Sequence, residues 1–316
     1  MKSLVTGGAG FIGSHLTEAL VARGESVSVL DNLATGYLEN LDAVKNQIEF
    51  IQGDLADLET VQKAARAVDV IFHQAALPSV PRSIKNPRAS HDANLTGTLN
   101  VLIAARDNQV KRVVMASSSS VYGNSPALPK VETFEPAPLS PYAVTKLAGE
   151  YYARVFAALY GVSTICLRYF NVFGPRQDPT SQYAGALAKF IACALRGEPY
   201  PVYGDGEQSR DFTYIENVVR ANLLAARSEV DGAAAVNIAG GARTTLNQII
   251  ATLNELTAQN LPTQYGAPRA GDVLHSHADI SRAGALLGYA PTVDVREGLR
   301  RTVEWYARNP EHKSSR

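Results

Sequence analysis

The first half of the chain alternates short apolar runs with longer segments whose apolar residues recur at helical spacing. Six runs have the length of strands: Ser3–Thr6, Ser26–Leu30, Ile48–Ile51, Val68–Phe72, Arg112–Ala116 and Val162–Leu167. The segments between them are long enough for crossover helices. Since parallel strands need such crossovers, the alternation predicts a parallel sheet with helices on both faces.

The pattern becomes irregular after about Leu167. Helix breakers recur there at Gly174-Pro175, Gly197-Glu198-Pro199 and Gly204-Asp205-Gly206. They predict a smaller, loop-rich second unit. We expect the first unit to span residues 1–170, joined again by 211–240, and the second to span 171–210 and 241–316.

Composition and charge narrow the class of protein. The 316 residues include 30 Lys and Arg against 30 Asp and Glu, and no segment concentrates the positive charge that a nucleic-acid partner requires. No apolar run reaches the ~18 residues that span a membrane, and Met1–Val5 leads directly into a glycine loop, so we expect no signal peptide and a cytoplasmic protein. Cys166 and Cys193 lie in apolar contexts and are expected to be buried free thiols.

The glycine loop is the first candidate for chemistry. Gly7, Gly10 and Gly13 follow the first strand and lead into the amphipathic stretch Phe11–Ala22. Glycines there allow a tight turn and let the helix amino terminus bind a pyrophosphate. Three glycines with this spacing also occur by chance, so the motif alone is weak evidence for a cofactor site. The residues around it, its context in the chain, strengthen that evidence.

That context is two acids at strand ends. Asp31 ends the second predicted strand, eighteen residues after Gly13, where an acid bonds the ribose hydroxyls of NAD and repels the extra phosphate of NADP. The alternative for Asp31 is a solvated turn residue. Asp54 follows the third strand and suits the adenine amine.

A second candidate is a tyrosine and a lysine one helical turn apart. Ser140 and Pro141 have the residue types of an N-cap and first helical position, which places Tyr142 in the first turn and Lys146 on the same face. A phenol with a pKa near 10 acts as a base near neutrality only after roughly 4 kcal/mol of phenolate stabilisation. The ammonium, the helix amino terminus and a nicotinamide cation together supply interactions of that size.

The serine tract Ser117–Ser120 follows the predicted strand 112–116. A serine there can relay a proton between a substrate hydroxyl and Tyr142. The alternative is a turn capped by its own hydroxyls.

Together these motifs resemble the extended short-chain dehydrogenase/reductases, specifically the nucleotide-sugar epimerases and dehydratases. The resemblance covers essentially the whole chain and includes His73-Gln74-Ala75-Ala76 and Asn94 in Asn-Leu-Thr-Gly-Thr. It implies a Rossmann-like, doubly wound parallel sheet with a smaller C-terminal substrate-binding α/β unit. It also implies Ser118 as the catalytic hydroxyl, Tyr142 as the base and Lys146 as its electrostatic partner.

The resemblance implies NAD as the cofactor and a UDP-sugar as the substrate. The residues implied for NAD are Gly7, Gly10, Phe11, Ile12, Gly13, Asp31, Asn32, Asp54, Leu55, Gln74, Ala75, Ala76, Asn94, Tyr142, Lys146 and Tyr169. Those implied for the sugar nucleotide are Ser79, Val80, Ser83, Ser118, Ser119, Tyr142, Asn171, Gln177, Tyr203, Arg210, Arg269, Asp272 and Ser276.

Within that set, Arg210 and Arg269 are expected to grip the diphosphate as bidentate donors, although either arginine read alone is more typical of a surface residue. Asp272 is expected at the nucleotide ribose. In resembling epimerases the position of Ser276 controls access at the sugar 2-position, so a serine implies that N-acetylated sugars fit. A simple turn serine is the alternative.

Two further patterns separate the possible reactions. Dehydratase and decarboxylase relatives carry acids just after the catalytic hydroxyl, whereas Ser119 and Ser120 stand there in this chain. That departure favours simple 4-epimerisation.

His275 and His277 share one face of an extended segment, but without a third obvious ligand we expect no metal.

These features predict an isomerase that interconverts UDP-GlcNAc and UDP-GalNAc, and also UDP-Glc and UDP-Gal. A UDP-glucose or UDP-glucuronate 4-epimerase, a related decarboxylase or dehydratase, and more distantly a non-catalytic dinucleotide sensor are the alternatives. The stretches 94–106 and 141–158 have apolar residues at helical spacing, and the resemblance implies that they form a four-helix interface in a homodimer.

Overall fold

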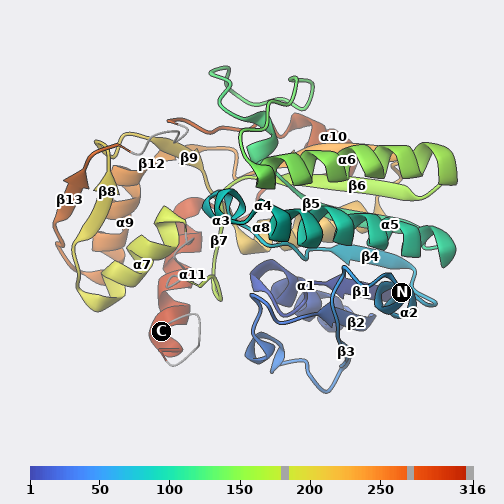
Figure 1. The fold of residues 1–316 in the computed structure, drawn as a ribbon. Helices are drawn as coiled ribbons and strands as arrows, with labels where there is room; N and C mark the ends of the chain where they lie inside the picture. Colours follow the sequence, from blue (N-terminus) through green and yellow to red (C-terminus); the bar gives the residue numbers. More distant parts are fainter. Residues whose placement is uncertain (179–184, 269–273, 311–316) are drawn as a thin grey trace.

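The structure, a computed structural model, describes residues 1–178, 185–268 and 274–310 (Figure 1). Its centre is a seven-stranded sheet in the order β11-β6-β5-β4-β1-β2-β3, with every neighbouring pair parallel. The strands are β1 (Lys2–Thr6), β2 (Ser26–Asp31), β3 (Ile48–Gln52), β4 (Val70–His73), β5 (Arg112–Ser118), β6 (Ser163–Tyr169) and β11 (Ala233–Ile238). All six strands predicted in the first half are confirmed, as is the Rossmann-like fold class.

Helices cover both faces of this sheet (Figure 1). One face carries α1 (Phe11–Ala22) and α8 (Ile215–Arg227), and the other carries α2 (Leu58–Ala64), α5 (Gly97–Asp107) and α6 (Pro141–Tyr160). Alternation along the strands builds the two cores. Val5 packs with Leu16 of α1 in one core, whereas Leu4 packs with Val101 of α5 in the other.

The second unit lies at the carboxyl-end side of the sheet and is built from short strands and helices (Figure 1). Its elements are β7 (Val172–Phe173), α7 (Ala186–Arg196), β8 (Tyr200–Tyr203), β9 (Ser209–Asp211), β12 (Arg243–Thr245), α9 (Leu246–Thr257), β13 (Thr263–Gly266), α10 (Ser281–Leu287) and α11 (Val295–Arg308). Strand β12 pairs with β9, and β13 pairs with β8. Strand β7 pairs with β10 (Thr213–Tyr214), which leads into α8.

Local sequence explains where α6 begins and ends. The hydroxyl of Ser140 accepts a hydrogen bond from the backbone N–H of Ala143 at 3.2 Å, and Pro141 occupies the first turn. Gly161 ends the helix with φ +69°, in the left-handed region. The predicted N-cap and helix start at 140–141 are therefore confirmed.

The helix expected over 94–106 is interrupted near its start. Two short helices, α3 (Val80–Lys85) and α4 (Pro87–His91), precede it, and the stretch itself begins as a π-helical turn (Asp92–Thr96) that continues into α5. The helical pattern is thus correct in kind, but its first turn is widened where Asn94 points inward.

The order of the strands places the ligand crevice. The chain leaves β1 toward β2 on one side of the sheet and later reaches β4 on the other, so the loops after β1 and β4 diverge at their carboxyl ends. In open parallel sheets, ligands bind at this switch point. The glycine loop and residues 74–79 lie there.

Candidate active site

The glycine loop is held so tightly that side chains are excluded from it. A Cβ at Gly13 would lie 2.1 Å from the carbonyl oxygen of Gly7, and Gly7 itself has φ +71°. Among the described residues, no side chain caps the amino terminus of α1, so the N–H groups of Phe11 and Ile12 are available to an anion. The loop therefore fits a pyrophosphate, as predicted for NAD.

Asp31 is a buried carboxylate, only 8% exposed, which rules out a solvated turn residue. It accepts hydrogen bonds from the backbone N–H groups of Ala9 at 3.0 Å and Leu33 at 2.8 Å. Burial raises the pKa of Asp31 above its usual value, although these two bonds oppose the shift. The group is thus positioned at the carboxyl end of β2, where an NAD ribose is expected.

The loop after β3 lies beside Asp31. The amide of Asn32 donates to the carboxylate of Asp54 at 2.8 Å, so the two residues predicted near the adenosine contact each other. The backbone carbonyl of Leu55 accepts from Asn100 of α5 at 2.8 Å. These bonds fix the loop against the body of the sheet.

A closed ring of hydrogen bonds holds Gln74 and Tyr169. The phenol of Tyr169 donates to Gln74 at 3.1 Å, Gln74 donates to Asn222 at 2.9 Å, and Asn222 donates to the Tyr169 oxygen at 2.8 Å. Ala75 covers the glycine loop, since a Cβ on Gly7 would lie 2.6 Å from the Ala75 Cα. Asn222, on α8, was not predicted from the sequence.

Asn94 is almost fully buried, and its amide bonds within the protein. It accepts from the Leu77 N–H at 2.7 Å, and it donates to the Leu77 carbonyl at 3.2 Å and to Thr145 at 3.3 Å. Asn94 thus joins the loop that contains Ala76 to helix α6. In this structure it positions the predicted cofactor loop.

His73 is a neutral link beneath the same loop. Its ring nitrogens lie 2.8 Å from the Thr6 hydroxyl and 2.9 Å from the Thr98 hydroxyl. Because Thr98 donates to the Asn94 carbonyl, it accepts from His73 Nε2, and Thr6 donates to Nδ1. Burial, with a smaller effect of Lys146, lowers the pKa of His73 to about 3.

The three predicted catalytic residues come together. Ser118 ends β5 and caps the next turn by accepting from the Ser120 N–H at 3.2 Å, and its hydroxyl lies near the Tyr142 phenol, where it acts to lower the pKa of that group. Lys146 lies one turn along α6, with Nζ 5.9 Å from the centre of the Tyr142 ring. Ser118 is therefore a turn cap that also lies beside Tyr142.

The electrostatics of the tyrosine and lysine depend on burial. Burial raises the pKa of Tyr142, and the hydrogen bond from Ser118 opposes that rise. Burial lowers the pKa of Lys146 to about 8, while Cys166 and Glu150 oppose the decrease. The protein alone thus leaves the phenol protonated at neutral pH, and the lowering expected from the sequence requires the additional positive charge of a bound nicotinamide.

The remaining serines differ in their surroundings. The Ser117 hydroxyl donates to Glu150, away from Tyr142, and the buried Ser120 oxygen has no hydrogen-bond partner in the described part of the chain. Ser119 is partly exposed. Ser119 and Ser120, the two residues that follow Ser118, therefore differ in exposure and bonding from Ser117.

The predicted sugar-facing loop begins helix α3. Ser79 has φ +110° and caps the helix by accepting from the Arg82 N–H at 3.2 Å. Val80 is exposed, whereas Ser83 is fully buried and donates to the Val80 carbonyl at 2.7 Å. In this structure Ser83 braces the loop from inside.

Three predicted substrate residues are joined through Asp211. The amide of Asn171 donates to the Asp211 carbonyl at 3.0 Å, and Arg210 is the residue before Asp211. The backbone N–H of Ser276 donates to the carbonyl of Ser209 at 3.0 Å. Three separate segments of the chain, of which the outer two are more than a hundred residues apart, therefore present Asn171, Arg210 and Ser276 together.

The carboxylate of Asp211 fastens this arrangement. It is fully buried and accepts from the backbone N–H groups of Gly240 at 2.9 Å, Gly241 at 3.1 Å and Ala278 at 3.2 Å. Burial raises the pKa of Asp211 to about 6, and these bonds and His277 oppose the shift. Asp211 was not predicted from the sequence.

The other predicted substrate residues lie in different places. Gln177 donates to the Val172 carbonyl at 3.1 Å, and Tyr203 is half-exposed on β8. Arg210 donates to the carbonyls of Ser209 and Leu274, both at 3.0 Å. Arg269 and Asp272 lie outside the described residues.

Glu150 and Arg168 form a buried ion pair that the sequence analysis missed. The Arg168 guanidinium donates to the two carboxylate oxygens of Glu150 at 2.9 and 2.6 Å. The signal in the sequence is an acid four residues after Lys146, on the same face of the predicted helix. An acid there faces the sheet, where it requires a buried partner.

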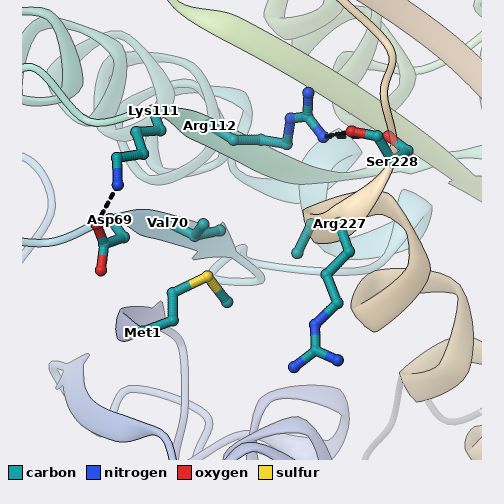
Figure 2. Close-up of a pocket in the computed structure, with 8 residues that line it drawn as sticks. Met1, Asp69, Val70, Lys111, Arg112, Arg227 and Ser228 are labelled. Atoms are coloured by element: carbon teal, nitrogen blue, oxygen red, sulfur yellow. Dashed lines mark hydrogen bonds and ion pairs between the residues drawn. The ribbon is translucent and has the colours of Figure 1, made fainter.

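A depression of about 480 Å³ opens at the opposite, amino-terminal edge of the sheet (Figure 2). Although several cations line it, each has an internal partner. Lys111 pairs with Asp69 at 2.8 Å, Arg112 donates to the Ser228 carbonyl, and Arg227 pairs with Glu25 at 3.0 Å. Its place at the amino-terminal ends of the strands separates it from the catalytic residues.

Three expectations concern the rest of the molecule. Both Cys166 and Cys193 are free and buried, as predicted. Among the described residues, no group of three or more His, Cys, Asp or Glu gathers to hold a metal, and His275 is hydrogen-bonded to Ser209 at 2.9 Å. None of the helices in the described ranges is long and apolar enough to cross a membrane.

Comparison with known proteins agrees with this geometry. The profile of the NAD dependent epimerase/dehydratase family matches residues 3–239. A putative UDP-glucose 4-epimerase from Methanocaldococcus jannaschii is 38% identical over 310 residues, which cover 97% of this chain and 98% of that protein.

Two solved structures are similar along the whole chain. UDP-N-acetylglucosamine 4-epimerase from Methanobrevibacter ruminantium, in complex with UDP-N-acetylmuramic acid, has a TM-score of 0.93 and 40% identity, with 98% of each chain covered. UDP-glucose 4-epimerase from Thermus thermophilus, in complex with NAD, has a TM-score of 0.88 and 39% identity, with 97% of this chain and 99% of that chain covered. The predicted family, its NAD cofactor and its isomerase class are confirmed, and the chain belongs to the NAD dependent epimerase/dehydratase family, among the UDP-sugar 4-epimerases.

Proposed function

We propose that this protein is a 4-epimerase that interconverts UDP-GlcNAc and UDP-GalNAc, and also UDP-Glc and UDP-Gal. The observation that carries the proposal is the convergence of Ser118 and Lys146 on Tyr142: the serine hydroxyl acts to lower the pKa of the phenol, and the Lys146 Nζ lies 5.9 Å from the centre of its ring. Such a set has a hydroxyl to relay a proton, a base to hold it and a cation to stabilise the phenolate. A non-catalytic sensor has no use for that base.

In the proposed reaction, Tyr142 removes the proton of the sugar 4-hydroxyl, and Ser118 relays it. NAD, when bound, would supply the hydride acceptor in its oxidised form, NAD⁺, and the hydride donor of the return step in its reduced form, NADH. The substrate passes through a 4-keto sugar, and Tyr142 gives the proton back to the inverted oxygen. Protons and electrons therefore balance within one cycle, and no external oxidant or reductant is consumed.

The second unit is proposed to hold the sugar nucleotide. We assign residues 171–210 and 241–316 to this unit and residues 1–170 with 211–240 to the NAD unit. Arg210 and Arg269 grip the diphosphate, Asp272 binds the nucleotide ribose, and Asn171 contacts the sugar or diphosphate. A substrate held at its diphosphate leaves the keto sugar free to rotate between its two faces.

The acceptance of N-acetylated sugars is attributed to Ser276. This residue is only partly buried, and its backbone is fixed against Ser209 at 3.0 Å. A small side chain on a fixed segment leaves room at the sugar 2-position. Exclusion there requires a bulky residue.

The direct test is incubation of the purified protein with UDP-GlcNAc and, separately, with UDP-Glc, without added NAD. Separation of the products should show the corresponding galacto isomer in both reactions, because NAD⁺ is regenerated in each cycle. Turnover of UDP-Glc alone, turnover of UDP-glucuronate, or release of carbon dioxide would each assign the protein to one of the alternative activities.

The specificity assignment has its own test in Ser276→Tyr. A bulky phenol should reduce kcat/KM for UDP-GlcNAc by about 100-fold or more while UDP-Glc loses less than about threefold, since a steric block acts only on the larger substituent. Equal losses on the two substrates would contradict the assignment.

The homodimer also remains a proposal, supported by the outer face of α6. Tyr151, Val155 and Leu159 follow one another at intervals of four residues and are 49%, 45% and 69% exposed. A continuous apolar stripe of this kind suits pairing with the same helix of a second copy. Light scattering should give a dimer for the parent and a monomer for Val155→Arg, and a monomeric parent would contradict the proposal.

A further inference from the structure

The interior between α6 and the sheet contains a fixed pair of opposite charges behind the catalytic residues. Glu150 is four residues after Lys146 on α6 and is 8% exposed. Its carboxylate accepts from Arg168 of β6 at 2.9 and 2.6 Å and from the hydroxyl of Ser117. A buried carboxylate with three such donors is held in one place.

The groups that face Lys146 come from three elements. Tyr142 and Glu150 lie on its own helix, His73 on β4 and Cys166 on β6. Because burial keeps His73 neutral and raises the pKa of the Cys166 thiol, Glu150 is the member of this set that carries negative charge near neutral pH.

Arg168 holds the negatively charged Glu150 carboxylate in an ion pair. Among the described residues, this is the ion pair that Glu150 forms. The Lys146 ammonium does not join this pair and donates to the Ala116 carbonyl at 2.8 Å. Burial acts to lower the pKa of Arg168, but the opposing effects of its bonds, chiefly those to Glu150, are together larger, so the pKa is raised above its usual value and the guanidinium stays charged. Glu150 thus acts on Lys146 without drawing the ammonium away from Tyr142.

The pair is anchored beyond the active site as well. Arg168 also donates to the Tyr122 oxygen at 2.8 Å, and Tyr122 donates to Asn237 of β11 at 2.7 Å. Ser117 precedes Ser118 on β5. The same carboxylate therefore joins the helix that holds the base to the strand end that holds its hydroxyl partner.

We propose that Glu150 is a positioning residue for the epimerisation: held by Arg168 and Ser117, it keeps Lys146 charged behind Tyr142 and ties α6 to the end of β5. The inference rests on the proposed function, since it assigns Glu150 to the Tyr142 and Lys146 pair. Its role is electrostatic and acts through Lys146, with no contact to substrate.

The test is the pH profile of kcat for Glu150→Gln, which keeps the shape of the side chain and removes its charge. The alkaline limb set by Lys146 should move down by about one pH unit, because an opposite charge nearby favours the ammonium. Glu150→Asp restores the charge and should return the limb to within a few tenths of a unit of the parent. Glu132→Gln is the matched control, since Glu132 bonds Asn237 at the far end of the same chain of contacts and its substitution should leave the limb in place.

A purely structural role would lower kcat equally at every pH, and an unmoved limb in Glu150→Gln overturns the proposal. If that variant melts below the assay temperature, the double variant Glu150→Gln/Arg168→Met removes both buried charges and leaves no unpaired ion. It should still show a downward movement of the limb, smaller than in the single variant because the positive charge of Arg168 is lost as well. An inactive Tyr142→Phe with an unmoved limb in the charge variants would refute this inference alone. An active Tyr142→Phe would refute the proposed function itself.

Discussion

The two ends of the site are assembled in different ways. At the catalytic end, on helix α6, Tyr142 and Lys146 are neighbours because one helix places residues four apart on one face. On the substrate side, Asn171, Arg210 and Ser276 meet because Asp211 and the backbone of Ser209 join separate segments. The first end is therefore built by local geometry and should govern kcat, whereas the second is built by long-range contacts and should govern KM.

The largest effect is expected from Tyr142→Phe. Loss of the acid–base group should lower kcat by about 10³-fold, while the protein still binds NAD⁺, since the phenyl ring keeps the packing. Turnover assays and the absorbance of the co-purified cofactor measure both quantities. Activity above a tenth of the parent's would contradict the assignment of Tyr142 as the base.

A smaller effect, on KM and not on kcat, is expected from Asp211→Asn. The amide presents a donor to backbone N–H groups that need an acceptor, so the segments at Gly240 and Ala278 should loosen. KM for the UDP-sugar should rise about tenfold, with kcat within about threefold of the parent. Asp205→Asn, on the exposed surface of the same unit, is the control, and a loss confined to kcat would break the comparison.

The pH dependence of KM should show the same division. Asp211 has its pKa raised to about 6, so between its usual value and 6 the folded protein binds the proton more readily than the unfolded chain. Lowering the pH through 6 therefore does not destabilise the fold through this group, but it removes acceptor capacity from the carboxylate. KM should rise several-fold below pH 6 in steady-state assays while the melting temperature does not fall on account of Asp211, and a flat KM would contradict the assignment.

The smallest effect is expected at the amino-terminal edge of the sheet. Arg227→Ala removes a cation from the depression in Figure 2 and leaves Glu25 without its ion pair. Since the Arg227 side chain is half-exposed but Glu25 is buried, stability should fall by about 1–3 kcal/mol, while kcat and KM should stay within about twofold. A larger change in either kinetic parameter would extend the site to the opposite edge of the sheet.

Most of the fold could be predicted from the sequence because its signals are local. The apolar runs of β1 to β6, the glycine loop and the N-cap at Ser140 each depend on residues close together in the chain. The π-helical turn at Asp92–Thr96 was missed because it depends on Asn94 reaching Leu77 and Thr145. No periodicity within the segment itself records those contacts.

The same distinction applies to the site. The sequence by itself determined the glycine loop, the acid after β2 and the tyrosine and lysine one turn apart, because helix and strand periodicity fixes such neighbours without reference to the rest of the chain. Only the tertiary structure decided that Arg168 pairs with Glu150, that Asn222 closes the ring with Gln74 and Tyr169, and that Asp211 joins three segments. The physical reason is burial: a polar group removed from water must find a partner, and which partner it finds depends on the packing of segments that the sequence separates.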